Sequence, residues 1–337
     1  MDRFGATIGV ALDVRIEIGS RRFNPERVLV LKHLVWRRLC LPQEFDPIKV
    51  FIKQEPHKRS KLDEGRLRLI SAVSLVDTMT DRIMFGWLMR SALSKIGMTP
   101  VMLGWSPLAG GYLYMHDKFR GKKTRGLDKT AWDWTVDRVT IETIRETIKR
   151  LAVDAPVTWL RWVDMRFECL FRDALYEFSD GAQIRQPGWG VMKSGCFLTI
   201  IANSIGQIIY HCRAMRSVGR SPGELAYVVI GDDVTIEDFP EFSAYEANIV
   251  AHGALLKPSE PTSHHAFAGF VFPSQNGRET VFPEYWEKHL FALTHAKEED
   301  VVRLLEVYSV LYAFEPRMLG FLRSVLRARS PASVLST

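Results

Sequence analysis

The segment that most constrains the fold is Tyr227 to Ile236, which reads YVVIGDDVTI. Residues with a strong strand preference lie on both sides of a Gly-Asp pair, and this arrangement predicts a β-hairpin. The turn carries two neighbouring carboxylates, Asp232 and Asp233, at a rigid point beside an apolar sheet. Such charge requires compensation, which in an enzyme of this size commonly comes from a divalent cation. Glycine and aspartate are also ordinary turn residues, so the segment alone is equally compatible with a structural turn.

The composition is that of a globular protein that could bind a polyanion. The chain has 337 residues, of which 47% are hydrophobic and 25% charged, enough for one large domain or two to three joined subdomains. The formal net charge is +6; basic residues concentrate in 21–38, 53–68 and 118–129, whereas 224–246 is acidic. This distribution is typical of a protein that binds phosphates and gathers metal ions at one point, although surface solvation explains any single run equally well.

Cysteine spacing and hydropathy exclude several classes of protein. The four cysteines show no CxxC spacing, so the sequence indicates neither a zinc site nor a disulfide framework, and we expect a reducing compartment. The most apolar run, 197–210, is too short to span a bilayer and contains Asn203 and Gln207. No signal peptide is indicated at the N-terminus. We therefore expect a soluble intracellular protein with no direct membrane span.

A basic segment, residues 47–70, combines strand-forming residues with a proline-containing turn. Residues 66–70 read RLRLI, which predicts a strand with Arg66 and Arg68 on one face. Two parallel guanidinium groups would form a clamp for a triphosphate, and an exposed strand edge protected by charge would show the same pattern. Further cations nearby in the sequence are Lys53, Lys58 and Lys61.

A pair of carboxylates lies in residues 126–137, which read GLDKTAWDWTVD. If a strand ends near Asp128 and turns into a helix, Asp128 and Asp133 can both reach one site at the end of that strand. Trp132 and Trp134 flank the second carboxylate.

Residues 185–207 begin as a glycine-rich loop and continue as an apolar helix, with Ser194 and Gly195 at the junction. Thr199 and Asn203 follow at spacings that place them on one face of that helix. Polar residues along a mostly apolar helix need hydrogen-bond partners. A buried hydrogen-bond network and a surface that reads a sugar are both consistent with this pattern.

Helical periodicity is found in several other parts of the chain, and the apolar faces are expected to form the core. A strand-like turn element is predicted at 266–272. The expected helices are 25–41, 71–96, 140–151, 156–176, 242–253 and 298–326.

In their order and spacing, these motifs resemble the palm of the viral RNA-dependent RNA polymerases. The motifs are the Asp128 and Asp133 pair, the polar set within 194–203, and the GDD sequence at 231–233. Residues 53–77 resemble the fingers motif of the sobemovirus and luteovirus-type polymerases of positive-strand RNA viruses. The resemblance covers about residues 49–272.

This resemblance implies an α+β right-hand polymerase fold with fingers, a palm built on an antiparallel sheet and a short helical thumb. The residues left for the thumb are few for this family, which leaves open how the product duplex is held. The implied divisions are fingers 1–125 with a basic motif for nucleotide access at 49–70, palm 126–155, a fingers insertion 156–190, palm 191–275 and a reduced thumb 276–337.

The activity implied by the resemblance is RNA-templated RNA synthesis, in which a nucleotide from an NTP joins an RNA 3′ end by a two-metal-ion mechanism. The family's pattern assigns two Mg²⁺ ions, for which Mn²⁺ would substitute, to Asp128 and Asp232, with Asp233 as an auxiliary ligand. Lys257 lies where these enzymes carry a lysine that is proposed to protonate the pyrophosphate.

Sugar selection is the role that the resemblance gives to Asp133. Together with Asn203, and with Ser194 or Thr199 beside Gly195, it would hydrogen-bond the ribose 2′-hydroxyl and select NTPs over dNTPs. A reverse transcriptase with a similar palm would carry a bulky aromatic residue at this position, so the carboxylate argues against that alternative.

Contacts with the triphosphate are implied for the fingers. Arg68 matches the arginine over the incoming triphosphate, and 266–272 resembles the turn that grips a primer. The channel by which nucleotides enter would be lined by Lys53, Lys61 and Arg66.

The expected partners are an RNA template, the product strand, NTPs and other viral replication proteins. The expected location is the host cytoplasm, at membrane-associated replication complexes reached through those proteins. A non-catalytic RNA-binding replication subunit is a further alternative. It predicts loss of the acidic set, and Asp128, Asp232 and Asp233 are all present.

Overall fold

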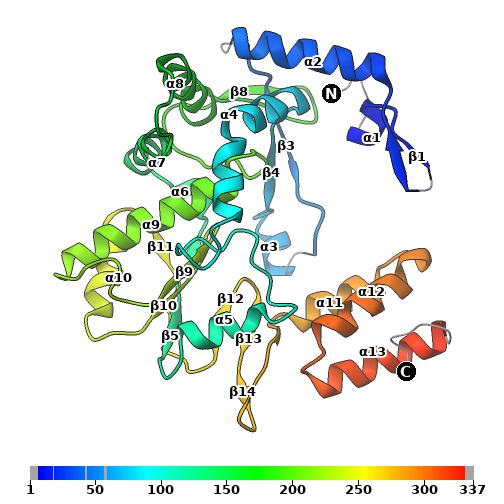
Figure 1. The fold of residues 1–337 in the computed structure, drawn as a ribbon, viewed down its shortest axis with the longest axis vertical. Helices are drawn as coiled ribbons and strands as arrows, with labels where there is room; N and C mark the ends of the chain where they lie inside the picture. The colour runs from blue at the N-terminus through cyan, green and yellow to red at the C-terminus, as the bar shows by residue number, and fades with distance from the viewer. Residues whose placement is uncertain (1–6, 18, 42–43, 57–58, 331–337) are drawn as a thin grey trace.

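The computed structural model describes residues 7–17, 19–41, 44–56 and 59–330, and helices and short strands alternate along it (Figure 1). The helices are α1 (Ile8–Ala11), α2 (Pro25–Cys40), α3 (Arg59–Asp63), α4 (Leu75–Leu93), α5 (Gly111–Lys118), α6 (Trp132–Thr135), α7 (Arg138–Leu151), α8 (Val157–Phe171), α9 (Thr199–Ser217), α10 (Phe242–Ala251), α11 (Trp286–Thr294), α12 (Glu298–Leu311) and α13 (Pro316–Arg329). The strands are β1 (Arg15–Glu17), β2 (Ser20–Arg22), β3 (Ile48–Ile52), β4 (Leu69–Ala72), β5 (Thr124–Gly126), β6 (Lys129–Thr130), β7 (Leu175–Glu177), β8 (Gln183–Arg185), β9 (Tyr227–Ile230), β10 (Asp233–Glu237), β11 (Leu255–Leu256), β12 (His265–Phe267), β13 (Phe270–Phe272), β14 (Ser274–Gln275), β15 (Arg278–Glu279) and β16 (Phe282–Pro283).

The antiparallel sheet β5-β10-β9 carries the turn at Gly231 and Asp232 at one end, and helix α9 packs against it. Helix α9 packs on β9, and α7 and α10 pack on α9 (Figure 1). Val229, Val234 and Ile236 are buried in the same core as Ile201 and Ile205 of α9. Burial of these apolar side chains fixes the sheet against the helix, so the ends of the strands are rigid.

A second sheet has the strand order β4-β3-β7-β8, and β3 pairs with β7 in parallel. It therefore joins the basic segment near residues 48–72 to the chain that follows α8. Helix α2 packs on α4 beside this sheet, and Arg166 of α8 reaches Asp81 of α4 through two buried hydrogen bonds of 2.7 Å.

The predicted helices at 25–41, 71–96, 140–151, 156–176 and 242–253 correspond to α2, α4, α7, α8 and α10.

The predicted strand-like element at 266–272 is confirmed as the hairpin β12–β13, whose far strand also pairs with β16. Its turn contains Ala268 at φ +52° and Gly269 at φ +77°. The hairpin lies against the central sheet because the Thr235 hydroxyl donates a hydrogen bond of 2.6 Å to the Ala266 carbonyl. The tip of this hairpin is thereby directed to the same end of the sheet as the β9–β10 turn.

The C-terminal helices α11, α12 and α13 form a group at one side of the molecule with a hydrophobic cluster of their own (Figure 1). The prediction of one continuous helix over 298–326 is wrong, because α12 ends at Leu311 and α13 begins at Pro316. Proline lacks an N–H and restricts the residue before it, so it starts a new helix, which the Glu315 carboxylate caps at the Met318 N–H. Among the described residues, no helix combines the length and the apolar character needed to cross a membrane.

Candidate active site

The β9–β10 turn consists of Gly231 and Asp232, with Asp233 paired across from Ile230, so the predicted hairpin is confirmed. Gly231 has φ +62°, and the φ of Asp232 is not positive, as expected for a type II′ hairpin turn with glycine first. The Gly231 N–H donates a hydrogen bond of 2.9 Å to the Ser204 hydroxyl of α9. The two carboxylates therefore lie on a turn that is tied to the core helix.

Asp128 reaches the same turn from β5. In the antiparallel register Gly126 pairs with Thr235, and the Leu127 N–H donates a hydrogen bond of 3.0 Å to the Val234 carbonyl. One step further in this register sets Asp128 across from Asp233. The carboxylates from two separate segments thus meet at one end of the central sheet, as the resemblance to the polymerase palm implies.

Burial and neighbouring carboxylates together set the electrostatics of this end of the sheet. Desolvation, followed by the negative charges of Asp232, Asp128 and Glu284, raises the pKa of Asp233 to about 6. In the described ranges no group of three His, Cys, Asp or Glu side chains is arranged to hold a metal ion. The oxygen donors suit a hard divalent cation, but the side chains must rotate toward one another to enclose it.

Two lysines partly balance the carboxylates. Lys257 forms an ion pair with the Asp128 carboxylate, and its N–H donates a hydrogen bond of 3.0 Å to the Asp128 carbonyl. Lys129 is buried, and burial lowers its pKa to about 8. The negative charges of Asp232 and Asp128 act in the opposite direction on that pKa. Lys257 was predicted at the site, whereas Lys129 was not, because a lysine inside a strand is ordinarily expected to be exposed.

The proposed sugar-reading pair, Asp133 and Asn203, is in contact. The Trp132 indole N–H donates a hydrogen bond of 2.9 Å to Asn203 Oδ1. Because an indole can only donate, the Asn203 amide nitrogen is left to donate to the Asp133 carboxylate, and it does so. Burial and the charge of Asp232 raise the pKa of Asp133, while Asn203, Arg68 and Lys193 oppose that rise.

The loop before α9 is bound to the β3–β4 sheet. The Ser71 N–H donates to the Ser194 hydroxyl at 3.1 Å, and the Gly195 N–H donates to the Ser71 carbonyl at 3.0 Å. A Cβ at Gly195 would lie 2.6 Å from that carbonyl oxygen, so the close approach requires glycine. The Thr199 hydroxyl donates to the Cys196 carbonyl at 2.8 Å. Contacts of Ser194 and Thr199 with a ribose stay a prediction.

Two of the predicted triphosphate ligands converge on one carboxylate. Lys53 and Arg68 each contact Glu55, at 2.8 Å in both ion pairs. The Lys53 N–H also donates a hydrogen bond of 2.8 Å to the Arg68 carbonyl, which aligns the two residues side by side. Arg68 is exposed and lies close enough to Asp133 to lower the pKa of that carboxyl.

The predicted strand over residues 66–70 is confirmed only for Leu69 and Ile70 and is wrong for Arg66, because β4 begins at Leu69. Gly65 has φ +66°, and the Arg66 N–H donates a hydrogen bond of 2.8 Å to the Lys61 carbonyl, so Arg66 belongs to a turn. Its guanidinium forms an ion pair with Glu64, so Arg66 and Arg68 do not form the predicted pair on one face of a strand. Lys61 lies on the exposed helix α3. Binding of nucleotides by Lys61 and Arg66 stays a prediction.

Glu284 and Tyr285 lie at this site but were not predicted. The Glu284 N–H donates a hydrogen bond of 2.9 Å to the Gly269 carbonyl at the tip of the β12–β13 hairpin. Burial and then Glu284, Asp128 and Asp233 raise the pKa of Tyr285. No local pattern in the sequence indicates this placement, since it depends on the long-range pairing of β13 with β16.

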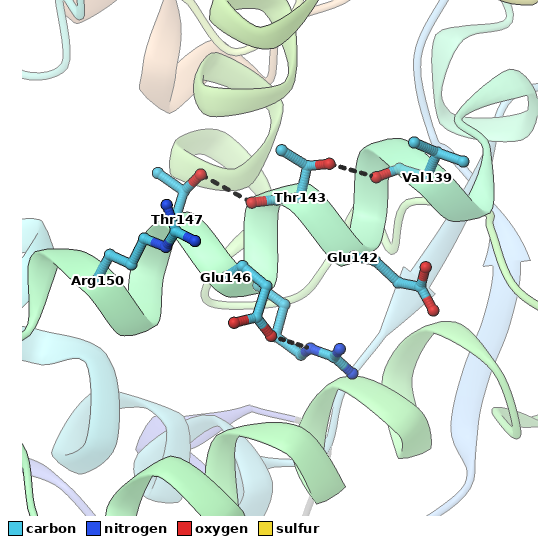
Figure 2. Close-up of a pocket in the computed structure, with 7 residues that line it drawn as sticks. Val139, Glu142, Thr143, Glu146, Thr147 and Arg150 are labelled. Atoms are coloured by element: carbon cyan, nitrogen blue, oxygen red, sulfur yellow. Dashed lines mark hydrogen bonds and ion pairs between the residues drawn. The ribbon is translucent and has the colours of Figure 1, made fainter.

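A surface depression with a volume of about 500 Å³ lies elsewhere, along the outer side of α7 (Figure 2). All of its lining residues come from that one helix, and none belongs to the set predicted to bind metal or nucleotide. Its threonine hydroxyls hydrogen-bond the helix backbone at 2.7 Å (Figure 2). The lining residues are Val139, Glu142, Thr143, Arg145, Glu146, Thr147 and Arg150.

The known proteins to which this chain is similar include viral replicases and RNA polymerases. A family model described as viral RNA-directed RNA-polymerase matches residues 29–104. The chain is 34% identical over 257 residues to the replicase polyprotein P2AB of Cocksfoot mottle virus, a match that covers 69% of this chain and 25% of the relative. It is 26% identical over 254 residues to the RNA-directed RNA polymerase of Mushroom bacilliform virus, covering 73% of this chain and 59% of the relative. The chain thus spans about a quarter of the first relative.

The solved structure of a Sicinivirus 3Dpol RNA dependent RNA polymerase matches with a TM-score of 0.72 at 18% identity, covering 94% of this chain and 68% of that one. The predicted fold is confirmed: this is a right-hand polymerase fold. The predicted resemblance is confirmed as well, because the relatives come from sobemoviruses and luteoviruses and include the replicase polyprotein P2AB of Southern bean mosaic virus and the protein P1-P2 of Potato leafroll virus.

Proposed function

From its right-hand fold and its similarity to viral RNA-directed RNA polymerases, we propose that this chain synthesises RNA on an RNA template and replicates a viral RNA genome. The observation that carries the proposal is the meeting of Asp128 with Asp232 and Asp233 at the end of the central sheet, beside the Asp133–Asn203 pair. Nucleotidyl transfer by two metal ions requires carboxylates from two separate elements. A carboxylate beside an amide can form hydrogen bonds with a ribose hydroxyl.

Divalent cations, Mg²⁺ or Mn²⁺, would be held by Asp128, Asp232 and Asp233. Such ions neutralise phosphate charge and lower the pKa of a bound hydroxyl, which is the chemistry that phosphoryl transfer needs. The raised pKa of Asp233 supports this assignment, because desolvation and, after it, three neighbouring carboxylates disfavour the charge of Asp233, and a cation would relieve both effects. Lys257 would exchange its ion pair with Asp128 for a position near the pyrophosphate and would supply the proton to that leaving group.

Nucleotide binding would use the two sides of the site. Asp133 would accept a hydrogen bond from the ribose 2′-hydroxyl, and the Trp132–Asn203 hydrogen bond would keep the amide oriented toward that carboxylate. In the fingers, Lys53 and Arg68 are already aligned by Glu55 and would exchange that carboxylate for the triphosphate. Bidentate contacts with phosphate favour arginine in such a position.

The test is incorporation of nucleotides on a short RNA template in Mg²⁺, with and without a primer, comparing NTPs with dNTPs and the wild-type chain with Asp232→Ala. We expect incorporation of NTPs only, and loss of synthesis without loss of RNA binding in the variant. Equal use of dNTPs would favour the reverse transcriptase alternative. RNA binding without any incorporation would favour a non-catalytic replication subunit, and full activity of Asp232→Ala would contradict the metal assignment.

The proposed partners are the RNA template and product, NTPs and other viral replication proteins, and the proposed location is the host cytoplasm at membrane-associated replication complexes. The similarity to viral replicases is the support for both. Sedimentation of the chain with membranes only when the other replication proteins are present would support this location. Its sedimentation with membranes in their absence would contradict attachment through partners.

A further inference from the structure

Lys193 is a completely buried lysine in the loop that connects the two halves of the site, with 0% of its surface exposed. Its ammonium donates hydrogen bonds of 2.7 Å to Gln186 Oε1 and to the Val191 carbonyl. The rings of Phe171 and Tyr176 each lie 5.4 Å from the nitrogen, and both contacts are of the cation–π kind. A buried ammonium is costly unless it is fully paired, so an apolar side chain would satisfy the core more simply.

The loop that Lys193 holds is strained. Val191 has φ +55°, a conformation that is unfavourable for a β-branched residue, and the Lys193 ammonium binds the carbonyl of that same residue. Gln186 supports the arrangement through hydrogen bonds to the carbonyls of Gly188 at 2.6 Å and Gly190 at 3.0 Å. Strain of this kind persists where the surroundings determine the conformation, and it is concentrated at functional sites.

This loop contacts Asp133 directly. The Met192 N–H donates a hydrogen bond of 2.7 Å to the Asp133 carbonyl, and Gly195 at the other end of the loop pairs with Ser71. The Lys193 charge is also felt at the Asp133 carboxyl, where it opposes the rise in pKa caused by burial and by Asp232. Lys193 is therefore placed to control both the position and the charge of Asp133.

We propose that Lys193 is a positioning residue for sugar selection: its buried side chain holds the 190–195 loop against Asp133 and keeps that carboxylate aimed at the ribose 2′-hydroxyl. The inference rests on the proposed function, and it assigns to Lys193 no contact with the nucleotide. It predicts a defect in the choice between NTP and dNTP that is larger than any general loss of rate.

The primary measurement is the ratio of kcat/KM for an NTP to kcat/KM for the matching dNTP, in the wild-type chain and in Lys193→Met. Methionine has a similar length and no charge, and we expect the ratio to fall about tenfold, the effect of weakening one hydrogen bond to the 2′-hydroxyl by about 1.4 kcal/mol. Lys193→Arg, which keeps the charge, should retain most of the ratio. Tyr176→Phe is the matched control: it removes the hydroxyl that shares Gln186 Oε1 at 2.9 Å and should leave the ratio unchanged.

The double variant Lys193→Met with Val191→Gly separates positioning from folding. Glycine adopts φ +55° without strain, so the double variant should regain stability, measured by thermal unfolding, while its ratio stays low. Recovery of the ratio together with stability would overturn the inference, as would equal losses with NTP and dNTP in Lys193→Met. Absence of incorporation by the wild-type chain is a different outcome, which would overturn the proposed function itself.

Discussion

Asp77 in helix α4 and Asp233 in the β9–β10 hairpin both have a pKa of about 6, but their neighbours are of opposite charge. Burial raises the pKa of Asp77, and the guanidinium groups of Arg166 and Arg38 oppose that rise. Desolvation raises the pKa of Asp233, and the carboxylates around it raise the pKa further. The same pKa therefore describes a balanced charge in one region and an unbalanced one in the other.

The balanced region connects three helices. Asp81 and Arg166 form a buried pair with two hydrogen bonds of 2.7 Å, Arg38 lies 2.7 Å from Asp77, and the Phe45 ring lies 3.9 Å from the Arg166 guanidinium. These contacts join α2, α4 and α8 and pair both buried carboxylates with guanidinium groups. At the β9–β10 hairpin the opposite holds, because the neighbouring carboxylates outnumber the cations that partly balance them. We expect this difference in charge compensation to distinguish carboxylates that stabilise the fold from carboxylates that bind a substrate or ion.

The largest expected effect is on the fold, from Asp81→Ala. The substitution leaves Arg166 buried without its partner, which destabilises proteins by about 3–5 kcal/mol. Urea denaturation followed by circular dichroism would measure the free energy of unfolding. Asp81→Leu with Arg166→Met removes both charges and should recover most of the loss. Equal stability of Asp81→Ala and the wild type would contradict the structural role of this pair.

The second effect is on activity alone, from Asp232→Asn. The side chain is exposed on a two-residue turn and keeps its size, so stability should change little. Loss of one charge at the reaction centre is expected to lower kcat by about 10³-fold. Single-nucleotide extension under saturating NTP gives kcat, and urea denaturation of the same sample is the control. A variant that loses stability in proportion to activity would show that the two regions do not differ as described.

Local patterns predicted the part of the site that depends on neighbouring residues. The hairpin around Gly231, the carboxylate at the end of the β5 strand, and the polar face of α9 with Asn203 all follow from strand and helix periodicity. Long-range pairing decided the rest. The burial of Lys129 and Lys193, and the approach of Glu284 through β16, depend on segments far apart in the chain, for which the sequence has no local signal.

Turn chemistry and proline explain two sequence predictions that failed. Gly65 keeps Arg66 in a turn, so the alternation in 66–70 is not that of a strand, although alternating residues ordinarily indicate one. Pro316 divides a continuous amphipathic pattern into α12 and α13. In both places a single residue with restricted or unusual backbone geometry outweighed the periodicity of side chains.

A smaller effect on activity is expected for Lys257→Met. The ion pair with Asp128 is exposed, with 56% and 64% of the two side chains accessible, so its loss should change stability little. Removal of a general acid typically lowers the rate by 10² to 10⁴, and we expect about 10²-fold in kcat. Lys122→Met, which breaks a partly exposed pair with Glu237 at 2.7 Å, is the matched control and should keep full activity. Unchanged kcat in Lys257→Met would exclude a role in proton transfer.

The smallest expected effect is on the free energy of unfolding, and its sign should differ between substitution of Asp233 and substitution of Asp77. Because the pKa of Asp233 is raised from 3.8 to about 6, the folded state binds a proton more tightly than the unfolded state between these values. The contribution of this group to stability is therefore greatest at low pH and is lost as the pH rises through 6. Without divalent cations at pH 7.5, Asp233→Asn should stabilise the fold, by about 1 kcal/mol or less because the side chain is exposed to water.

Thermal unfolding of Asp233→Asn and Asp77→Asn at pH 4 and pH 7.5 would test that sign. The gain in Asp233→Asn should vanish near pH 4, where the wild-type carboxyl is protonated, and Mg²⁺ at pH 7.5 should reverse it by stabilising only the wild type. Asp77→Asn should instead destabilise the fold, because an amide would turn its NH2 group toward either the Arg38 guanidinium, 2.7 Å from Asp77, or the Asp46 N–H, which donates to Asp77 at 2.9 Å. If both substitutions shifted stability in the same direction at pH 7.5, the surplus of negative charge at the β9–β10 hairpin would not be what distinguishes it from the region around Asp77.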